Sequence, residues 1–566
     1  MKGYQKYIPF KPISLPDREW PAKVIEKAPV WCSVDLRDGN QALIDPMNMQ
    51  EKLEFFKVLC DIGFKEIEVG FPSASETEYE TCRELITGGH IPDDVWIQVL
   101  VQARPHLIEK TFRAIEGAKN VIVHFYNSTS TLQRKVVFKK DQKGIIDIAV
   151  KGAELIKKLT DECKTCENIR FEYSPESFSG TEGDFAVEIC SNVLDVLEAT
   201  PENPVILNLP NTVEMCTPNT YADQVEYFIK NLPGRERAII SIHPHNDRGT
   251  GVAAAELALL AGAERVEGTL FGNGERTGNL DIVTVALNMY TQGIDPKLDF
   301  SDLPALKRMY ERITKMKINE RHPYVGELVF TAFSGSHQDA ISKGFEYMKQ
   351  SKSPYWEIPY LPIDPADIGR QYEPIIRINS QSGKGGAAFI MEHVFGYKLP
   401  KEMHPEFGAM VKAKCDQLGR ELTNEELMQV FEDGYLNIEE KYRLLSHKLY
   451  ESSEHGHAIV HFEGVIEIDG KPFSASGEGN GPIDAFFNAL RKLGIADYEF
   501  LSYNEHAISS GSDSKAIAYI HLRIPDDGHV FGVGIESNIY YASIKGVLNA
   551  INRAEKLKAS MSGGNA

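Results

Sequence analysis

The chain has 566 residues, of which 42% are hydrophobic, 10% aromatic and 25% charged, the composition of a globular protein with a large buried core. At roughly 100 to 200 residues per domain, this length predicts two or three domains, and the composition excludes a disordered or collagen-like chain. Lys and Arg number 61 against 81 Asp and Glu, a formal net charge of −20. Because this charge repels a polyphosphate backbone, we expect no nucleic acid partner.

The sequence contains no segment typical of secretion or membrane insertion. The first ten residues lack an apolar core, and the longest nearly apolar stretch, residues 252–263, is too short to cross a bilayer and contains Glu256. Eight cysteines are too few for a disulfide framework. Reduced thiols fit a cytoplasmic enzyme. Cys163 and Cys166 form a C-x-x-C pair, but no second pair of ligands completes a zinc site.

In the first half of the chain, the hydrophobic period switches repeatedly between 2 and 3.6, which indicates strands that alternate with helices. Eight short segments rich in Val, Ile, Phe or Tyr are the predicted strands. They begin at Val30, Lys65, Val95, Asn120, Ile169, Pro204, Arg237 and Glu264.

Amphipathic stretches such as MQEKLEFFKVLCDIG and FAVEICSNVLDVLEA lie between these strands, with a repeat of about 30 residues. Right-handed strand-helix-strand crossovers produce a parallel sheet, and eight repeats within about 260 residues are typical of a closed (β/α)8 TIM barrel. An open doubly wound sheet is the alternative. The count of eight favours the barrel, as does the absence of G-x-G-x-x-G after the first strand.

Polar residues gather where the predicted strands end, which is where barrel enzymes carry their reactive groups. His243 and His245 are two positions apart on one strand, so both imidazoles point to the same side, into the mouth of the barrel. Asp38 after the first strand and Asn279 after the eighth could complete a set of two nitrogen and two oxygen ligands. Such a set suits Mg, Mn, Zn or Co. The alternative is a pair of histidines that cap the next helix.

The segment GNGERTGN, residues 272–279, has too many glycines for a helix and too much charge for a strand interior. We expect a loop that holds backbone close to a ligand. It is not a Walker phosphate loop, because it lacks G-K-[ST]. A salt bridge within the loop is the alternative role for Glu275 and Arg276.

Three motifs in this order, LRDGNQ at 36–41, HPHND at 243–247 and GNGERTGN at 272–279, resemble the alpha-isopropylmalate synthase family. This family belongs to the barrel superfamily of metal-dependent Claisen-condensing and lyase enzymes. The similarity covers nearly the whole chain and resembles the larger branch of the family. It continues through SGSHQDA at 334–340, NSQSGKGG at 379–386 and GEGNGPIDA at 477–485.

The resemblance implies a reaction and its cofactor. Acetyl-CoA condenses with the 2-oxo acid 3-methyl-2-oxobutanoate and water to give 2-isopropylmalate and CoA, the committed step of leucine synthesis. Asp38, His243, His245 and Asn279 match the family's ligands for a divalent metal ion, Mg, Mn or Zn, which acts as a Lewis acid on the 2-oxo acid. Arg37 resembles the arginine that stabilises developing oxyanion charge.

The resemblance also supplies the other site residues. The residues that match the 2-oxo acid pocket are His124, Tyr126, Ser174, Pro210 and Thr212. Glu176 and Glu275 resemble the family's active-site acids, and His337 and Tyr372 resemble its proton-transfer pair.

The second half of the chain carries a weak internal repeat from Ala458 onward. In each copy a hairpin-like segment with a Gly-x-Gly precedes a helix, and the glycines are Gly479 and Gly481, then Gly532 and Gly534. Free amide groups at such helix starts can bind a carboxylate. In the family this domain binds leucine as a feedback inhibitor, and the pseudo-symmetry favours a homodimer. Tight strand-to-helix turns are the alternative role of these glycines.

The predicted fold class is therefore a (β/α)8 barrel followed by a mostly helical linker and an α+β domain. The predicted domains are an N-terminal extension at 1–29, the catalytic barrel at 30–325, linker subdomains at 326–440 and the leucine-binding regulatory domain at 441–566.

Several alternatives stay open at the level of sequence. A sister synthase that makes homocitrate or citramalate would share the barrel and the metal, and a lyase or carboxyltransferase would not need the C-terminal repeat. An inactive scaffold that senses an amino acid is a third class. The basic run at residues 133–140 could meet the phosphates of CoA, although a solvated loop is the favoured interpretation. Its basic residues are Arg134, Lys135, Lys139 and Lys140.

Overall fold

The chain forms two compact units in the computed structural model. The first is Met1–Phe330 with Pro362–Gln371, and the second is Thr331–Leu361 with Tyr372–Ala566. The described residues are 3–332, 334–372, 384–420, 422–436, 438, 441–454, 457–495, 498–508, 514–524 and 528–562. The first five residues of the NSQSGKGG motif, 379–383, lie outside them.

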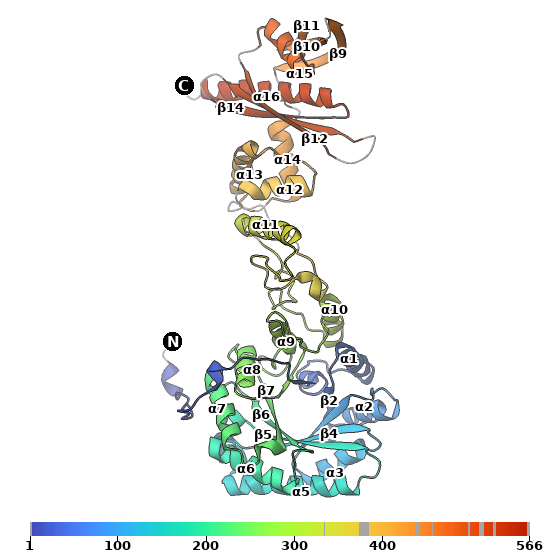
Figure 1. Cartoon of the computed structure of the whole chain (residues 1–566), viewed down its shortest axis with the longest axis vertical. Helices are drawn as coiled ribbons and strands as arrows, with labels where there is room; N and C mark the ends of the chain where they lie inside the picture. Colours follow the sequence, from blue (N-terminus) through green and yellow to red (C-terminus); the bar gives the residue numbers. More distant parts are fainter. Residues whose placement is uncertain are drawn as a thin grey trace. The chain divides into compact units, whose positions relative to one another are not determined.

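The first unit contains a closed barrel of eight parallel strands in the order β1 to β8 (Figure 1). Strand β8 pairs with β1, with Val30 opposite Arg265, and this pairing closes the sheet. The prediction of a closed barrel is confirmed, and each predicted strand begins within one residue of its observed start. The strands are Val30–Ser33, Glu66–Gly70, Trp96–Gln102, Asn120–Ser128, Asn168–Glu176, Val205–Asn211, Ala238–Pro244 and Arg265–Gly268.

Helices surround the barrel and cover its outer face, so strands such as β2 and β6 are buried along their whole length. Helix α1 illustrates the local signals: Asn48 and Glu51 form a capping box at its start, and Gly63 ends it at φ 115°. The helices α1 to α10 are Met49–Ile62, Glu76–Thr87, Pro105–Ala114, Thr131–Gln133, Gln142–Glu162, Gly183–Val196, Pro218–Asn231, Gly251–Leu260, Ile282–Tyr290 and Leu303–Thr314.

The second unit begins with four helices, α11 Gly335–Ser351, α12 Lys384–His393, α13 His404–Leu418 and α14 Asn424–Tyr435. Phe407 of α13 and Phe431 and Tyr435 of α14 form an aromatic cluster, with ring centroids 5.4 to 6.2 Å apart. The same core includes Tyr519 and Phe531 from the following sheet. These helices therefore pack on the C-terminal α+β part.

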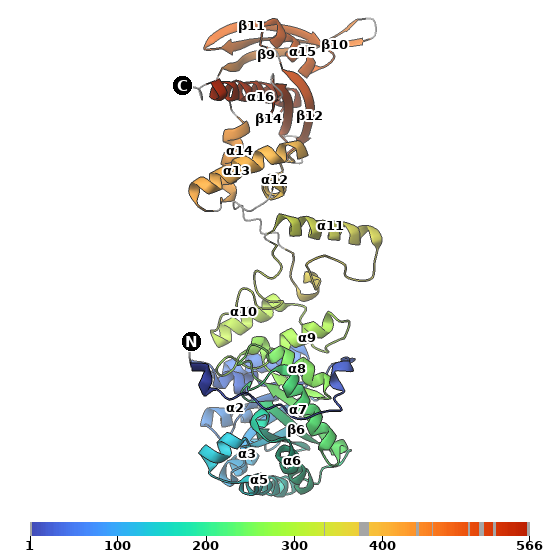
Figure 2. The ribbon, with the colours of Figure 1, turned by 90° about the vertical axis from the view of Figure 1, so that its left-hand side faces the viewer.

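The C-terminal part is a repeat of three antiparallel strands and one helix (Figure 2). The first copy contains β9 Tyr442–Glu454, β10 His457–Ile468, β11 Lys471–Gly479 and α15 Pro482–Lys492. The second contains β12 Glu499–Ala507, β13 Ala516–Ile524, β14 Gly528–Glu536 and α16 Ile539–Ser562. The predicted α+β repeat is confirmed. The hairpins in the sequence did not reveal the first strand of each copy, β9 and β12, because the exposed side chains of these strands weaken the apolar alternation.

The glycines of the repeat occupy different positions in the two copies. Gly479 ends β11 and Gly481 is the N-cap of α15, as expected for a helix start. Gly532 and Gly534 lie inside β14, so the expectation that they stand at the start of the second helix is wrong.

Close packing explains the glycines in β14. A Cβ atom on Gly532 would lie 2.2 Å from the backbone nitrogen of Ala550, and one on Gly534 would lie 1.9 Å from the carbonyl oxygen of Ala542. Both contacts are to the backbone of α16. Glycine therefore lets the strand and the helix touch, while Asn538 begins α16 by accepting hydrogen bonds from Tyr540 and Tyr541.

Two further findings concern membranes and thiols. None of the helices in the described part of the chain combines the length and the apolar character needed to cross a bilayer. All eight cysteines are free thiols. Cys163 and Cys166 lie at the end of α5 with their sulfur atoms 2.9 Å apart.

Candidate functional site

A cavity of about 880 Å³ opens at the carboxyl ends of the barrel strands. Polar side chains from at least six strand ends line it, so the chemistry-bearing residues of the first unit are collected in one place. The predicted residues in its lining are Arg37, Asp38, His124, Tyr126, Ser174, Glu176, Pro210, Thr212, His243, His245 and Glu275.

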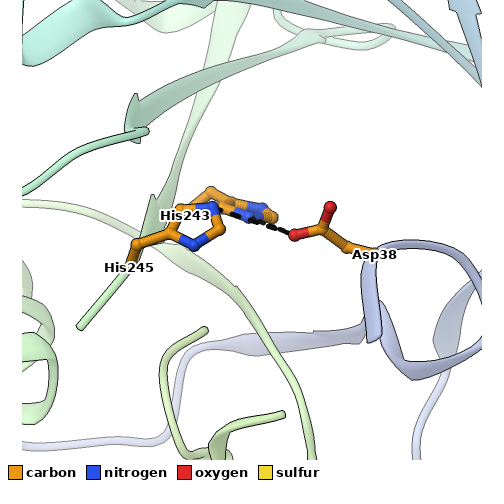
Figure 3. Close-up of side chains that lie close together, drawn as sticks. All are labelled: Asp38, His243 and His245. Carbon is orange, nitrogen blue, oxygen red and sulfur yellow. Dashed lines mark ion pairs between the residues drawn. The ribbon is translucent and has the colours of Figure 1, made fainter. Parts of the chain in front are cut away.

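Asp38, His243 and His245 line this cavity and lie close together (Figure 3). The Oδ2 atom of Asp38 lies 3.3 Å from Nε2 of His243 and 3.8 Å from Nε2 of His245. The amide oxygen of Asn279 lies 3.1 Å from Nε2 of His243. The structure thus brings together all four residues predicted to bind metal.

Local structure explains how these side chains meet. Strand β1 is followed by a π-helical turn, Asp35–Gly39, and the carboxylate of Asp35 accepts a hydrogen bond from the backbone nitrogen of Leu270 at 3.1 Å. This contact fixes the turn that carries Asp38 against the segment after β8. The side-chain nitrogen of Asn279 donates to the carbonyl oxygen of Asn273 at 3.0 Å, so the amide oxygen of Asn279 faces His243.

Burial and ion pairing act in opposite directions on these groups. Burial lowers the pKa of His243, but the carboxylates of Asp38 and Glu267 outweigh it and raise the pKa to about 9. Burial and the neighbouring His243 lower the pKa of His245 to about 4. Burial raises the pKa of Asp38, but Arg37 and His243 more than reverse this and hold it well below its usual range. Asp38 is therefore ionised, and the two imidazoles differ in their affinity for a proton.

The donor atoms fit a divalent cation. Buried Oδ2 of Asp38 and Nδ1 of His245 have no hydrogen-bond partner among the described residues. Two imidazole nitrogens, a carboxylate oxygen and an amide oxygen are ligands that Zn, Mn or Mg accepts in proteins. A cation bound by Oδ2 of Asp38 would satisfy a buried acceptor that the described residues leave without a hydrogen-bond partner.

Arg37 is held rigidly at the edge of the cavity. Its Nη1 donates to Oδ1 of Asp38 at 2.5 Å and its Nε donates to Glu68, which is fully buried. The two carboxylates raise the pKa of Arg37 despite its burial, which lowers it. The guanidinium is thus a fixed cation beside the predicted metal ligands.

The predicted pocket for the 2-oxo acid lies on the opposite side of the barrel mouth, on β4, β5 and β6. His124 hydrogen-bonds through Nδ1 to Glu68 at 2.7 Å and through Nε2 to Ser174 at 2.7 Å. The hydroxyl of Tyr126 accepts a hydrogen bond from Gln102 at 2.9 Å. Thr212 accepts one from the backbone nitrogen of Ser177 at 3.0 Å. Each polar side chain is thus oriented before any substrate binds.

The two glutamates of the cavity that resemble active-site acids differ in their partners. Glu176 accepts a hydrogen bond from Ser128. Glu275 accepts one from Gln41 at 2.9 Å. Next to Glu275, Arg276 donates to Asp247 at 2.6 Å and to the carbonyl oxygen of Thr212 at 2.5 Å. Arg276 therefore forms its salt bridge with Asp247, which follows β7 and lies outside the 272–279 loop.

The glycine-rich loop is compact, as its composition predicts. Gly278 adopts φ 101°, and a Cβ atom there would lie 2.0 Å from the carbonyl oxygen of Gly272. This approach places Asn279 opposite His245, where the two residues form an isolated β-bridge. The loop thus places the amide of Asn279, the predicted fourth ligand, beside His243 and His245.

Two predicted site residues belong to the second unit. His337 is exposed on α11 and stacks on Tyr360 with ring centroids 4.1 Å apart. Tyr372 is half-buried beside Phe345, with its hydroxyl unpaired among the described residues, and burial raises its pKa. Their part in proton transfer stays a prediction.

In the basic run at residues 133–140, Arg134 is not available to bind a phosphate, because it is buried and donates a hydrogen bond to Glu182 at 2.6 Å. Lys135, Lys139 and Lys140 are exposed, which agrees with the solvated loop favoured from the sequence.

The sequence did not reveal the charged interior of the barrel. Glu66, Glu68, Glu172, Arg265 and Glu267 are at most 5% exposed. A signal was present, because charged residues stand at alternate positions of β2 and β8 where an ordinary barrel interior is aliphatic. Gln98 and Asn208 join this network through hydrogen bonds to Glu267 at 2.9 and 3.1 Å.

Comparison with protein families matches three segments of the chain. Residues 28–309 match an HMGL-like family, residues 327–392 an alpha-isopropylmalate synthase post-catalytic domain-like family, and residues 421–555 the LeuA allosteric (dimerisation) domain. The three matches follow one another along nearly the whole chain.

Curated relatives match over similar lengths. A 2-isopropylmalate synthase from Clostridium acetobutylicum is 57% identical over 98% of this chain and 100% of its own length. A 2-isopropylmalate synthase from Rhodospirillum rubrum is 53% identical over 97% of this chain and 98% of its own. One from Brucella suis is 54% identical over 97% and 98%, respectively.

Proposed function

The chain belongs to the 2-isopropylmalate synthase family of acyltransferases, and we propose that it condenses acetyl-CoA with 3-methyl-2-oxobutanoate and water. The products are (2S)-2-isopropylmalate and CoA, and the reaction is the first committed step of leucine biosynthesis. The observation that carries the proposal is the group of Asp38, His243 and His245 at the mouth of a polar cavity. We propose a cytoplasmic location, with no nucleic acid or membrane partner.

Asp38, His243, His245 and Asn279 would hold the divalent ion. A bound ion supplies Lewis-acid stabilisation for the carboxylate and keto oxygen of the 2-oxo acid. Arg37 presents a fixed guanidinium beside these ligands, where negative charge develops on the former keto oxygen. Because Glu68 and Asp38 hold the guanidinium in place, little reorganisation is needed as this charge develops.

His124, Tyr126, Ser174, Pro210 and Thr212 orient the 2-oxo acid in this proposal. Their hydrogen bonds to Glu68, Gln102 and Ser177 hold the pocket in one shape, which favours a single binding mode. Glu176 and Glu275 line the cavity and are the acids within reach of a substrate there. His337 and Tyr372 serve proton transfer in the same proposal.

We assign regulation to the C-terminal repeat, which matches an allosteric and dimerisation domain. Leucine would bind there as feedback inhibitor, and the active form would be a homodimer. Gly481 at the start of α15 is the position among the four glycines that leaves room for a ligand, since a Cβ atom there would meet nothing within 4 Å. Gly479, Gly532 and Gly534 would shape the site through their packing.

Release of the CoA thiol from acetyl-CoA in the presence of a panel of 2-oxo acids tests the reaction. We expect the highest kcat/KM with 3-methyl-2-oxobutanoate, and loss of turnover when divalent ions are removed by chelation. A higher value with 2-oxoglutarate or pyruvate would assign the chain to the sister syntheses of homocitrate or citramalate. No thiol release with any 2-oxo acid would favour the alternative that the chain is an inactive scaffold that senses an amino acid.

A separate measurement tests the regulation. Leucine is titrated into the full chain by calorimetry, and inhibition is measured at several concentrations of 3-methyl-2-oxobutanoate. We expect binding heat and an inhibition that saturating 2-oxo acid does not remove. Leucine that competes with the 2-oxo acid would place the inhibitor in the barrel instead.

A further inference from the structure

Glu267 on β8 is the most fully hydrogen-bonded acid of the barrel interior. It is 0% exposed, and four side chains surround its two oxygens. Oε1 lies 2.9 Å from Nε2 of Gln98 and 2.9 Å from Nη1 of Arg265. Oε2 lies 3.1 Å from Nδ2 of Asn208 and 2.8 Å from Nδ1 of His243.

The chemistry of these partners determines the direction of each hydrogen bond. Arg265 can only donate. The amide of Gln98 is oriented by a second contact, because its oxygen accepts a hydrogen bond from Nη2 of Arg265 at 2.7 Å, which turns its nitrogen towards Glu267. Glu267 is therefore an ionised acceptor in a fixed position, and the proton between it and His243 lies on Nδ1 of the imidazole.

We propose that Glu267 is a positioning residue for the metal site, which keeps a proton on Nδ1 of His243 so that Nε2 is the nitrogen that binds the ion. This inference rests on the proposed metal function. Nε2 of His243 faces two oxygens, Oδ2 of Asp38 at 3.3 Å and the amide oxygen of Asn279 at 3.1 Å. A cation among these three atoms would be bound by all of them. The contact between Nδ1 and Glu267 keeps the imidazole ring in the orientation that binding through Nε2 requires.

Glu267 also belongs to a second cluster, with Glu68 and His124, whose ligand atoms lie within 4.8 Å of one another. This cluster does not need a metal ion. Nε2 of Gln98 donates to Glu68 at 2.8 Å and to Glu267 at 2.9 Å, so an amide nitrogen occupies the place between the two carboxylates. Gln98 thereby connects the positioning of His243 to that of His124 in the pocket.

The barrel offers a matched control in Glu172. This acid is also 0% exposed and also lies near Arg265, at 3.3 Å. It makes no hydrogen bond to His243, and neither of its oxygens has a hydrogen-bond partner among the described residues. Burial raises the pKa of Glu172 well above its usual range, so Glu172→Gln replaces a neutral buried carboxyl and leaves the contact between Glu267 and His243 in place.

The test compares metal binding by the full-length wild type, Glu267→Gln and Glu172→Gln. Each protein is stripped of metal and titrated with Mn²⁺ in competition with a chelator, and circular dichroism checks the fold. We expect the Kd for Mn²⁺ to rise on the order of 10- to 100-fold in Glu267→Gln, because an amide cannot accept from all four donors. In Glu172→Gln we expect it to change less than about 2-fold.

A kinetic measurement separates positioning from general damage. With saturating Mn²⁺, turnover of Glu267→Gln should recover to within about 10-fold of wild type, because the ligands themselves are intact. An unchanged Kd in a folded Glu267→Gln would overturn the inference, as would an equal loss in Glu172→Gln. A wild-type protein that binds no Mn²⁺ and no Zn²⁺ would instead overturn the proposed metal function.

Nitrogen NMR of the wild type keeps the inference testable if Glu267→Gln does not fold. Protein labelled with ¹⁵N-histidine is recorded with Zn²⁺, and the His243 signals are assigned by their loss in His243→Gln. We expect protonated Nδ1 and metal-bound Nε2. Protonated Nε2 with metal on Nδ1 would overturn the inference.

Discussion

The barrel and the C-terminal repeat bury their interiors in opposite ways. The barrel interior contains ionised side chains, Arg265, Glu267 and Glu68, each held by several directional contacts. The core between the two copies of the repeat is apolar, with Phe462 and Phe486 among its side chains, and glycines bring strands onto helices. Unpaired buried charge is strongly unfavourable, whereas apolar contacts are non-directional.

The two regions therefore depend on different structural properties. The barrel interior holds atoms at fixed positions, because a displaced donor leaves a buried charge unpaired. The repeat depends on volume, because its strands and helices touch backbone to backbone. Substituting one polar side chain at the barrel mouth should therefore abolish activity while the barrel stays folded. Adding one methyl group to a glycine of the repeat should instead lower the stability of the second unit.

The largest effect is expected at the metal ligands. Substituting His243 and His245 by Ala should reduce CoA release to the limit of detection, because the ligand set loses both nitrogens. The fold should persist, since both side chains lie at the barrel mouth. Thiol release and circular dichroism measure the two properties. His106→Ala, on the exposed face of α3, is the control, and full activity of the double variant after chelation would contradict the metal assignment.

Arg37→Lys should lower kcat on the order of 100-fold. A lysine has one charged nitrogen and cannot contact Asp38 and Glu68 as the planar guanidinium does. Steady-state kinetics at saturating metal and substrates give the value, with Arg113→Lys on the surface of α3 as the control. Wild-type kcat in Arg37→Lys would move the oxyanion role to another residue.

Gly534→Ala should destabilise the second unit by about 1 to 3 kcal/mol, because the new Cβ meets backbone of α16 that cannot move aside. Gly481→Ala meets nothing within 4 Å and should change stability little. Denaturant unfolding followed by circular dichroism compares the two variants. Equal stability would show that β14 and α16 separate at little cost in free energy.

The smallest effect is expected on acid stability. Burial raises the pKa of Glu555, but hydrogen bonds from Lys441 and Tyr498 reverse this and lower it to about 2. Because the folded pKa is below the unfolded value, this stabilisation is present above pH 4.5 and is lost as the pH falls towards 2.

Glu555→Gln should therefore reduce the stability of the second unit at neutral pH by about 1 kcal/mol or less and make it less dependent on pH between 4.5 and 2. Thermal unfolding across this range checks the expectation. Glu451→Gln, exposed on β9, is the control. A parallel pH dependence in wild type and Glu555→Gln would show that the contact contributes nothing.

Local patterns in the sequence sufficed for the barrel and for the four candidate metal ligands, whereas the family resemblance supplied most other residues of the cavity. Alternating periods predicted the eight strands, and the two-residue spacing of His243 and His245 predicted that their side chains point the same way. In the repeat, patterns predicted the hairpins and helices but not β9 or β12. The prediction for Gly532 and Gly534 was wrong, because the sequence does not distinguish a glycine inside a strand from one just before a helix. The difference depends on the helix against which the strand packs.

The sequence by itself thus determined the elements and the polar residues at the strand ends, because hydrophobic period and turn residues act over a few neighbouring positions. Only the tertiary structure decided which distant residues meet. Closure between β1 and β8 brings Asp38 to His243, and the barrel register aims Gln98, Asn208 and Arg265 at Glu267. The physical reason is that a buried charge is stable only where several strands converge to pair it, and that convergence is a property of the closed sheet.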